Sequence, residues 1–146
     1  YSIAKKSPFE LSGGQKRRVA IAGVIVTSPE VLVLDEPVAG LDPIGKRELM
    51  RLLHELHSTT CKTVIIVSHD MDEVCENCTR VAVFSQGEVI AEGTPEEVFS
   101  QGEKMRGLRL GVPLTEYLSE RLAEKGVNLN CDLTENDFIR AVKELC

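Results

Sequence analysis

The apolar residues of this chain alternate between short continuous runs and helical stripes. The runs at residues 31–34 and 63–67 are rich in β-branched residues, which is typical of strands buried on both faces of a parallel sheet. Asp42-Pro43 is a typical helix start between them. The helix that follows carries four leucines at the spacing of one face: Leu49, Leu52, Leu53 and Leu56. This strand–helix–strand order predicts an α/β fold with a parallel sheet.

A second helix is expected nearer the N-terminus, beginning at Ser12. Ser12-x-x-Gln15 is a capping box, in which the serine oxygen accepts a backbone N–H and the glutamine side chain reaches back. The helix continues over residues 16–26 and ends before Pro29. Its small, largely apolar face consists of Val19, Ala20, Ala22, Gly23 and Val26.

Shorter elements follow the second strand. A helix is expected over residues 71–78, and two strands at 80–84 and 88–91 enclose a turn at Ser85-Gln86-Gly87. Thr94-Pro95 begins another helix, with threonine as the cap and proline in the first turn.

The character of the sequence changes near residue 100. Three glycines mark a linker there: Gly102, Gly107 and Gly111. Two helical segments follow, at residues 114–125 and 135–145, and no strand pattern recurs. We therefore predict an α/β part over residues 1–100 and a small helical C-terminal extension over residues 101–146.

The composition is that of a globular protein, with 42% apolar and 27% charged residues in a chain of 146. The net charge of −6 offers no attraction to the phosphates of nucleic acid, so no nucleic-acid partner is expected. The longest apolar stretch, residues 19–26, is far shorter than the about 20 residues that a membrane span needs. We therefore expect no direct membrane insertion.

The five cysteines have irregular spacing, which argues against a disulfide framework and for a reducing compartment. Cys75 and Cys78 form a C-x-x-C pair, but no second pair lies nearby in the sequence. Our interpretation is two cysteines on one helix that have no role as metal ligands.

Polar residues with possible catalytic roles follow both strands. Ligands of parallel sheets bind beyond the carboxyl ends of the strands. At the first strand, Asp35 could hold Mg²⁺ with water and phosphate oxygens, and Glu36 could act as the general base on an attacking water. The alternative is a strand end whose carboxylates face solvent. His69 follows the second strand and could hydrogen-bond a terminal phosphate, although a single histidine is more often structural.

The start of the first helix is a candidate phosphate site. Two glycines, Gly13 and Gly14, leave backbone N–H groups bare at a helix end where the dipole favours negative charge. Ser12 and Gln15 flank them. The alternative for these residues is helix capping without a ligand.

Four segments, in order, carry a resemblance to the ATP-binding-cassette (ABC) ATPases. Residues 11–15, Leu-Ser-Gly-Gly-Gln, resemble the signature motif, and residues 31–37 resemble the Walker B strand with its catalytic glutamate. Residues 39–42 resemble the D-loop, and residues 68–70 the loop of the switch histidine. The resemblance extends over residues 1–100 and implies a P-loop NTPase-like fold with ATP and Mg²⁺ as cofactors.

The resemblance also implies roles for the site residues. Two cassette domains, identical or different, would enclose ATP between the Walker A loop of one and the signature helix of the other. The γ-phosphate of the partner's ATP would contact the signature residues Ser12, Gly13, Gly14 and Gln15. Asp35 would bind Mg²⁺, while Glu36 and His69 would act on the subunit's own ATP. Asp42 would cross the dimer interface.

One motif of the family is missing from this chain, the Walker A loop G-x-x-x-x-G-K-[ST]. The nearest match, residues 40–46, does not qualify, because Arg47 stands where a serine or threonine must bind the metal. Within that match, Asp42 would place a carboxylate among the phosphates, and Pro43 has no N–H to offer. The glutamine loop is missing too. We therefore expect the C-terminal part of a cassette domain, inactive alone, whose sheet has unpaired apolar faces and edges.

The C-terminal extension indicates which group of ABC ATPases the chain resembles. Residues 111–116, 121–129 and 133–135 are similar to the C-terminal extension of energy-coupling-factor (ECF) transporter ATPases, which power uptake of vitamins or of transition-metal ions such as cobalt and nickel. This implies an ATPase subunit at the cytoplasmic face of the membrane, working with transmembrane transport subunits. Two alternatives stay open: a non-transport ABC ATPase of DNA repair or translation, and a non-catalytic domain that lends its signature motif to a partner.

Overall fold

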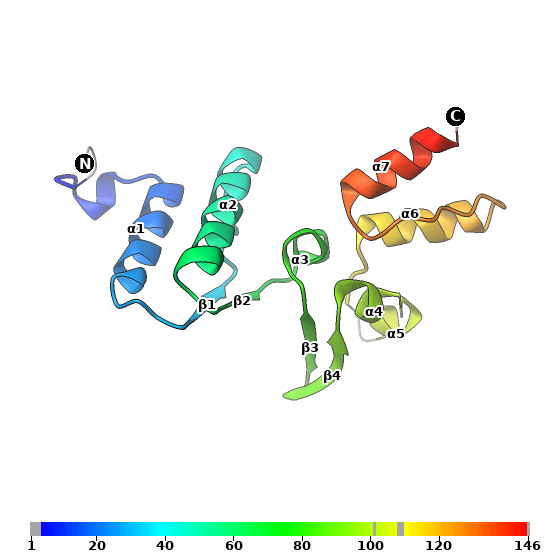
Figure 1. Cartoon of the computed structure of the whole chain (residues 1–146), viewed down its shortest axis with the longest axis horizontal. Helices are drawn as coiled ribbons and strands as arrows, with labels where there is room; N and C mark the ends of the chain where they lie inside the picture. Colours follow the sequence, from blue (N-terminus) through cyan, green and yellow to red (C-terminus); the bar gives the residue numbers. More distant parts are fainter. Residues whose placement is uncertain (1–3, 101, 108–109, 146) are drawn as a thin grey trace. The chain divides into compact units, whose positions relative to one another are not determined.

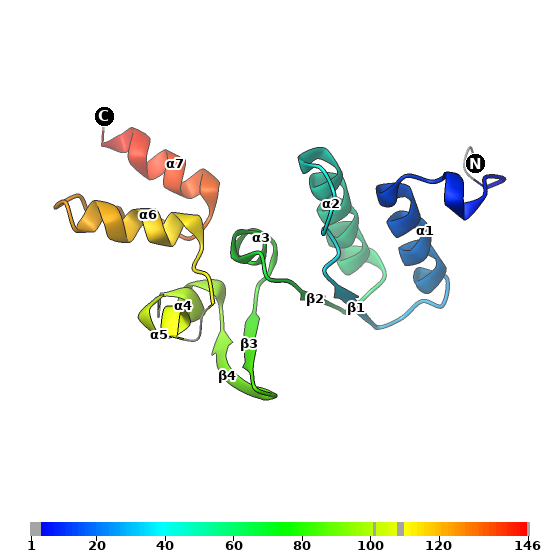
Figure 2. The same cartoon turned by 180° about the vertical axis from the view of Figure 1, so that it is seen from behind.

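The computed structural model describes residues 4–100, 102–107 and 110–145. The chain divides into two compact units, Tyr1–His69 and Asp70–Cys146. Figure 1 and Figure 2 show the elements of each unit in chain order, from the blue N-terminus to the red C-terminus. Within the described ranges, every helix is too short or too polar to cross a lipid bilayer.

The first unit is built on one parallel strand pair. Its elements are η1 (Pro8–Glu10), α1 (Gly13–Ile25), β1 (Val31–Asp35), α2 (Pro43–Thr59) and β2 (Thr63–Val67). The strands pair in parallel, with Val31 opposite Thr63 and Asp35 opposite Val67. The chain passes from β1 through α2 to β2, which is the crossover that parallel pairing requires. The predicted α/β class is confirmed.

The core of this unit lies between the two helices and one face of the strand pair. It joins Leu32 of β1 to Leu49 and Leu53 of α2, as the leucine stripe predicted, and to Ile21 of α1. The predicted apolar face of α1 is instead exposed. That face includes two exposed valines, and the core contact is made from another side of the helix by Ile21, with only 5% of its surface accessible, and by Ile25 one turn further on.

The other face of the strand pair is exposed. Side chains alternate along a strand, so four apolar residues lie on the face away from the core: Val31, Val33, Ile65 and Val67. Between 46% and 61% of the surface of each is accessible. The prediction of strands buried on both faces is therefore wrong for this unit, because both helices pack on the same side. The exposed apolar face that we expected for the sheet is present.

The second unit combines an antiparallel hairpin with short helices. Its elements are α3 (Met71–Asn77), β3 (Val81–Ser85), β4 (Glu88–Gly93), α4 (Pro95–Phe99), α5 (Gly102–Gly107), α6 (Leu114–Ala123) and α7 (Glu135–Glu144). The hairpin turn contains Gln86 and Gly87, both at positive φ, as a two-residue turn requires. The predicted hairpin and the helices on both sides of it are confirmed.

The segment predicted to be a linker contains helix α5. Met105 of this helix is fully buried, and it packs with Val98 and Phe99 of α4 and with Leu133 just before α7. Met105 thus attaches α5 to the core of the second unit, because the burial of this side chain outweighs the flexibility of the two glycines. The division at residue 100 into a cassette part and an extension stays a prediction.

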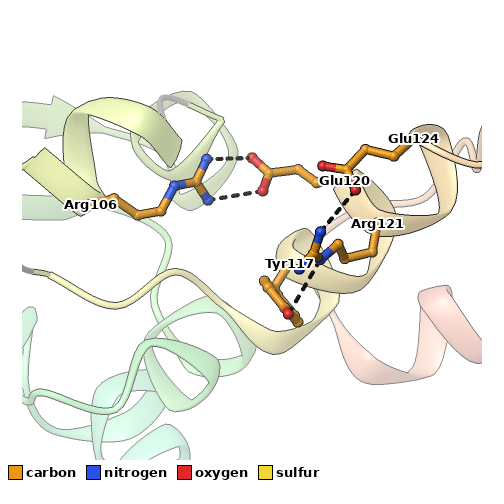
Figure 3. Close-up of polar contacts among 5 residues, drawn as sticks. All are labelled: Arg106, Tyr117, Glu120, Arg121 and Glu124. Atoms are coloured by element: carbon orange, nitrogen blue, oxygen red, sulfur yellow. Dashed lines mark hydrogen bonds and ion pairs between the residues drawn. The ribbon is translucent and has the colours of Figure 1, made fainter.

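An ion pair joins α5 to α6. Arg106 donates from both terminal nitrogens to Glu120, at 2.9 and 3.1 Å, and Figure 3 shows the planar fork facing the carboxylate. A Cβ on Gly102 would lie 2.9 Å from that carboxylate, so glycine leaves room for the pair. Figure 3 also shows contacts among three further residues at α6: Tyr117, Arg121 and Glu124. Since both partners are solvent-accessible, the bidentate pair sets the orientation of α6 more than it adds stability.

Cys75 and Cys78 lie at the C-terminal end of α3 as free thiols. Burial raises the pKa of the Cys75 thiol to about 12, and the neighbouring Asp72 adds to this shift. Burial likewise raises the pKa of Cys78. Because the thiolate is the form that reacts and binds metal, these shifts favour a structural role for the pair.

The raised pKa of Cys75 predicts a loss of stability at high pH. The folded state holds the thiol proton more tightly than the unfolded chain, in which the thiol titrates near its ordinary value of 9. The stabilising contribution is therefore complete below pH 9 and is lost as the pH rises toward 12. In thermal denaturation followed by circular dichroism, the Tm of the natural protein should fall more steeply over this range than that of Cys75→Ala. Parallel Tm curves would contradict the prediction.

Candidate functional site

The carboxyl ends of β1 and β2 bring together two predicted site residues. The backbone N–H of Glu36 donates to the carbonyl of Val67 at 2.8 Å, which extends the contact between the chain segments beyond β1. Nδ1 of His69 lies 2.5 Å from Oε1 of Glu36. The imidazole is 85% exposed and the carboxylate 33% exposed. A carboxylate and a titratable ring thus share a hydrogen bond at an accessible strand end, where they can accept a proton from water.

Glu36 has an unusual backbone conformation. Its φ is +46°, in the left-handed region that residues other than glycine seldom occupy and that surrounding contacts must support. Asp35 is the last residue of β1 and has an exposed side chain. The two adjacent carboxylates therefore leave the chain from different backbone conformations, one extended and one left-handed.

The loop after Glu36 connects this strand end to α2. Pro37 and Val38 are buried, and Gly40 turns the chain at a φ of +73°. Asp42 then accepts a hydrogen bond from the N–H of Gly45 at 2.6 Å and caps α2, as predicted. The loop is thus held at one end by the strand pair and at the other by a capped helix.

The N-terminus of α1 has the predicted capping box. Ser12 Oγ accepts a hydrogen bond from the Gln15 N–H at 3.3 Å, and the Gln15 side chain accepts one from the Ser12 N–H at 3.1 Å. These bonds run between the two residues and not to the carboxylates of the strand end. A Cβ on Gly13 would meet no atom within 4 Å, so the helix end is open to an anion.

Two hydrogen bonds join this helix to the loop after Glu36. Arg17 donates to the carbonyls of Pro37 and Ala39, the latter at 3.1 Å. A Cβ on Gly14 would lie 3.7 Å from the side chain of Leu41. The sequence did not identify Arg17, because its acceptors are backbone carbonyls 20 and 22 residues further on, which leave no residue pattern.

Comparison with known proteins agrees with these motifs. The family model described as ABC transporter matches residues 1–39. The energy-coupling factor transporter ATP-binding protein EcfA2 of Lacticaseibacillus paracasei is 46% identical over 139 residues, which cover 94% of this chain and 48% of that protein. The protein of the same name from Clostridium tetani is 49% identical over 142 residues, covering 96% of this chain and 48% of that protein. The chain spans about half the length of the curated relatives it matches.

Solved structures show the same likeness. CbiO1 from Clostridium perfringens, described as part of the ABC transporter complex cbiONQ, superposes with a TM-score of 0.61 at 49% identity, over 79% of this chain and 46% of that one. A nucleotide-free ATP-binding cassette from an ABC transporter superposes with a TM-score of 0.67 at 27% identity, over 75% of this chain and 44% of that one.

These likenesses define the class of fold as the ATP-binding cassette. The chain belongs to the ABC transporter ATPase family, with similarity to its energy-coupling factor members. The family resemblance of the sequence is thereby confirmed. The roles of the individual site residues remain predictions.

Proposed function

We propose that this chain is the C-terminal part of the ATP-hydrolysing subunit of an ECF-type importer. The observation that carries the proposal is the Glu36–His69 hydrogen bond at the carboxyl end of a parallel strand pair. The names of the similar proteins, which are transporter ATP-binding proteins, support the transport role. The proposed cargo is a vitamin or a transition-metal ion such as cobalt or nickel.

In this proposal the site residues of one chain act on two nucleotides, its own ATP and that of the partner subunit. Glu36 takes the proton from the water that attacks the γ-phosphate, and His69, hydrogen-bonded to Glu36, holds the carboxylate and contacts that phosphate. Asp42 lies at the interface with the partner subunit. The open end of α1 binds the γ-phosphate of the partner's ATP through the signature residues Ser12, Gly13, Gly14 and Gln15.

Asp35 fits the requirements of a Mg²⁺ ligand. This cation takes one or two carboxylates and completes its shell with waters and phosphate oxygens. The exposed carboxylate of Asp35 at the end of β1 offers one such ligand. Among the described residues no group of three His, Cys, Asp or Glu side chains could hold a metal by itself. This suits a cation that is shared with a nucleotide, whose phosphate charge it would neutralise during transfer.

The proposed partners are a second ABC ATPase subunit, identical or different, and transmembrane transport subunits at the cytoplasmic face of the membrane. A composite site requires the second ATPase, because the signature residues and Glu36 then serve different nucleotides. The exposed apolar face of the strand pair supports additional cassette structure packing there in the full-length ATPase.

The test of this function is Mg²⁺-dependent ATP hydrolysis by the full-length ATPase. Asp35→Asn keeps the shape of the side chain but removes its charge, so the half-saturating Mg²⁺ concentration should rise by about 10-fold or more. Asp132→Asn, at an exposed position of the second unit, is the matched control. An unchanged Mg²⁺ requirement in Asp35→Asn would remove this residue from the site. A full-length protein that does not hydrolyse ATP would overturn the function itself.

A further inference from the structure

Arg17 connects the two groups of site residues. It lies in α1, in the turn that follows the open helix end, and its half-buried side chain reaches the loop after Glu36. There its guanidinium donates to two backbone carbonyls, those of Pro37 and Ala39. Backbone carbonyls fixed by a charged donor lose freedom to move, because each such hydrogen bond is stronger than one between neutral groups.

The loop that Arg17 holds begins at the strained residue. Glu36 has a positive φ, and a non-glycine residue keeps such a conformation only where its surroundings over-determine it. On the N-terminal side, the N–H of Glu36 is tied to Val67 of β2. On the C-terminal side, the next residue is Pro37, whose carbonyl accepts from Arg17. The backbone of Glu36 is thus held by β2 on one side and by α1 on the other.

The neighbouring arginine shows that this contact is specific. Arg18 pairs with Glu48 of α2 at 3.1 Å, and both side chains of that pair are largely exposed. Arg17 alone of the two reaches the loop. A Cβ on Gly14, about one turn before Arg17, would lie within van der Waals distance of the Leu41 side chain, so the helix runs beside the loop at this position too.

We infer that Arg17 is a positioning residue for the hydrolytic step. By holding the carbonyls of Pro37 and Ala39, it keeps Glu36 in its left-handed conformation with the carboxylate at His69. The inference rests on the proposed function of Glu36 as general base. In that proposal the N-terminus of α1 binds the partner's nucleotide. Through Arg17, the same helix is also connected to Glu36, the general base for the subunit's own nucleotide.

The test uses kcat and KM of the full-length ATPase. In Arg17→Gln, kcat should fall by about 10- to 100-fold, as expected for the loss of charge-assisted hydrogen bonds, while KM for ATP changes by less than about threefold. Both bonds leave the same terminal nitrogen of Arg17, Nη1. The ammonium of Arg17→Lys also has several N–H donors but a shorter reach, so the kcat of this variant should lie between those of the unmutated protein and Arg17→Gln. Arg51→Gln, on the exposed surface of α2, is the matched control and should keep the natural kcat.

A double variant separates positioning from a structural role. Because Arg17 acts through Glu36, adding Arg17→Gln to Glu36→Gln should not lower the single-turnover rate below that of Glu36→Gln alone. A further loss of about 10-fold in the double variant would overturn the inference. So would a kcat for Arg17→Gln equal to that of Arg51→Gln. Where Arg17→Gln does not fold, Arg17→Lys decides: a reduced kcat at an unchanged Tm supports the inference, and an unchanged kcat overturns it.

The same experiments distinguish this inference from the proposed function. If Glu36→Gln hydrolyses ATP at the natural rate, the proposed function of Glu36 fails. If Glu36→Gln is inactive but Arg17→Gln behaves as Arg51→Gln does, only the positioning role fails.

Discussion

Replacing Glu36 by Gln in the full-length ATPase should nearly abolish turnover. Glutamine keeps the size of the side chain and can still contact His69, but it cannot accept a proton from the attacking water. Loss of a well-placed general base lowers a rate by about 10²–10⁴-fold, and we expect a fall of this size in kcat. ATP-driven association of two subunits should persist, because the residues proposed to bind phosphate are unchanged.

The control for this variant is Glu48→Gln. Glu48 is an exposed residue of the same unit that pairs with Arg18 on the surface, so its replacement should leave kcat unchanged. Steady-state ATPase assays measure the rate, and size-exclusion chromatography with ATP measures association. Undiminished hydrolysis by Glu36→Gln would show that another group activates the water.

Gly13→Asp should be the second most damaging change. A carboxylate in the first turn of α1 suits the helix dipole, so the fold should keep its Tm to within a few degrees. The same carboxylate would lie where the γ-phosphate of the partner's ATP is proposed to bind, and it would repel that phosphate. We expect hydrolysis to fall by about 100-fold or more, because a binding site for an anion becomes a repulsive one.

Gly13→Ala is the matched control. A Cβ at this position meets no atom within 4 Å, and alanine is a better helix former than glycine, so this variant should fold normally. Most of the activity should remain if charge, and not volume, is decisive. Equal losses in Gly13→Ala and Gly13→Asp would indicate a steric effect instead.

Mixing the two inactive variants tests whether the site is composite. In an assembly of identical subunits, a dimer of one Glu36→Gln subunit and one Gly13→Asp subunit contains one site with both changes and one site with neither. Hydrolysis should therefore reappear on mixing. If Gly13 and Glu36 served the same subunit's nucleotide, both sites of the mixed dimer would stay defective and no activity would return.

Local chemistry made much of the structure predictable from the sequence. The capping box of Ser12 and Gln15, the Asp42 cap of α2 and the hairpin turn at Gly87 depend on residues within a few positions of each other. The continuous apolar runs likewise indicated β1 and β2 and their parallel pairing. These features were correct because the hydrogen bonds that define them are local, or repeat with the period of the element.

Features that depend on packing were not predictable in the same way. The α1 stripe placed the apolar face on small residues, whereas Ile21 forms the core contact. The glycines near residue 102 indicated a linker, whereas Met105 is buried in the second unit. In the first case the neighbouring elements decide which side of the helix is covered, and in the second the burial of one large side chain outweighs the flexibility of the glycines.

The sequence by itself therefore determined the family, the elements and the residues that carry the proposed chemistry. Only the tertiary structure showed that Glu36 has a left-handed backbone, that His69 contacts it at 2.5 Å and that Arg17 holds the loop beside it. The physical reason is that these contacts join residues 20, 22 and 33 positions apart, and that the two made by Arg17 end on backbone carbonyls, which every residue has. The sequence identifies which residues carry a carboxylate or a guanidinium. Only the folded chain determines which carbonyl or ring each of these groups contacts.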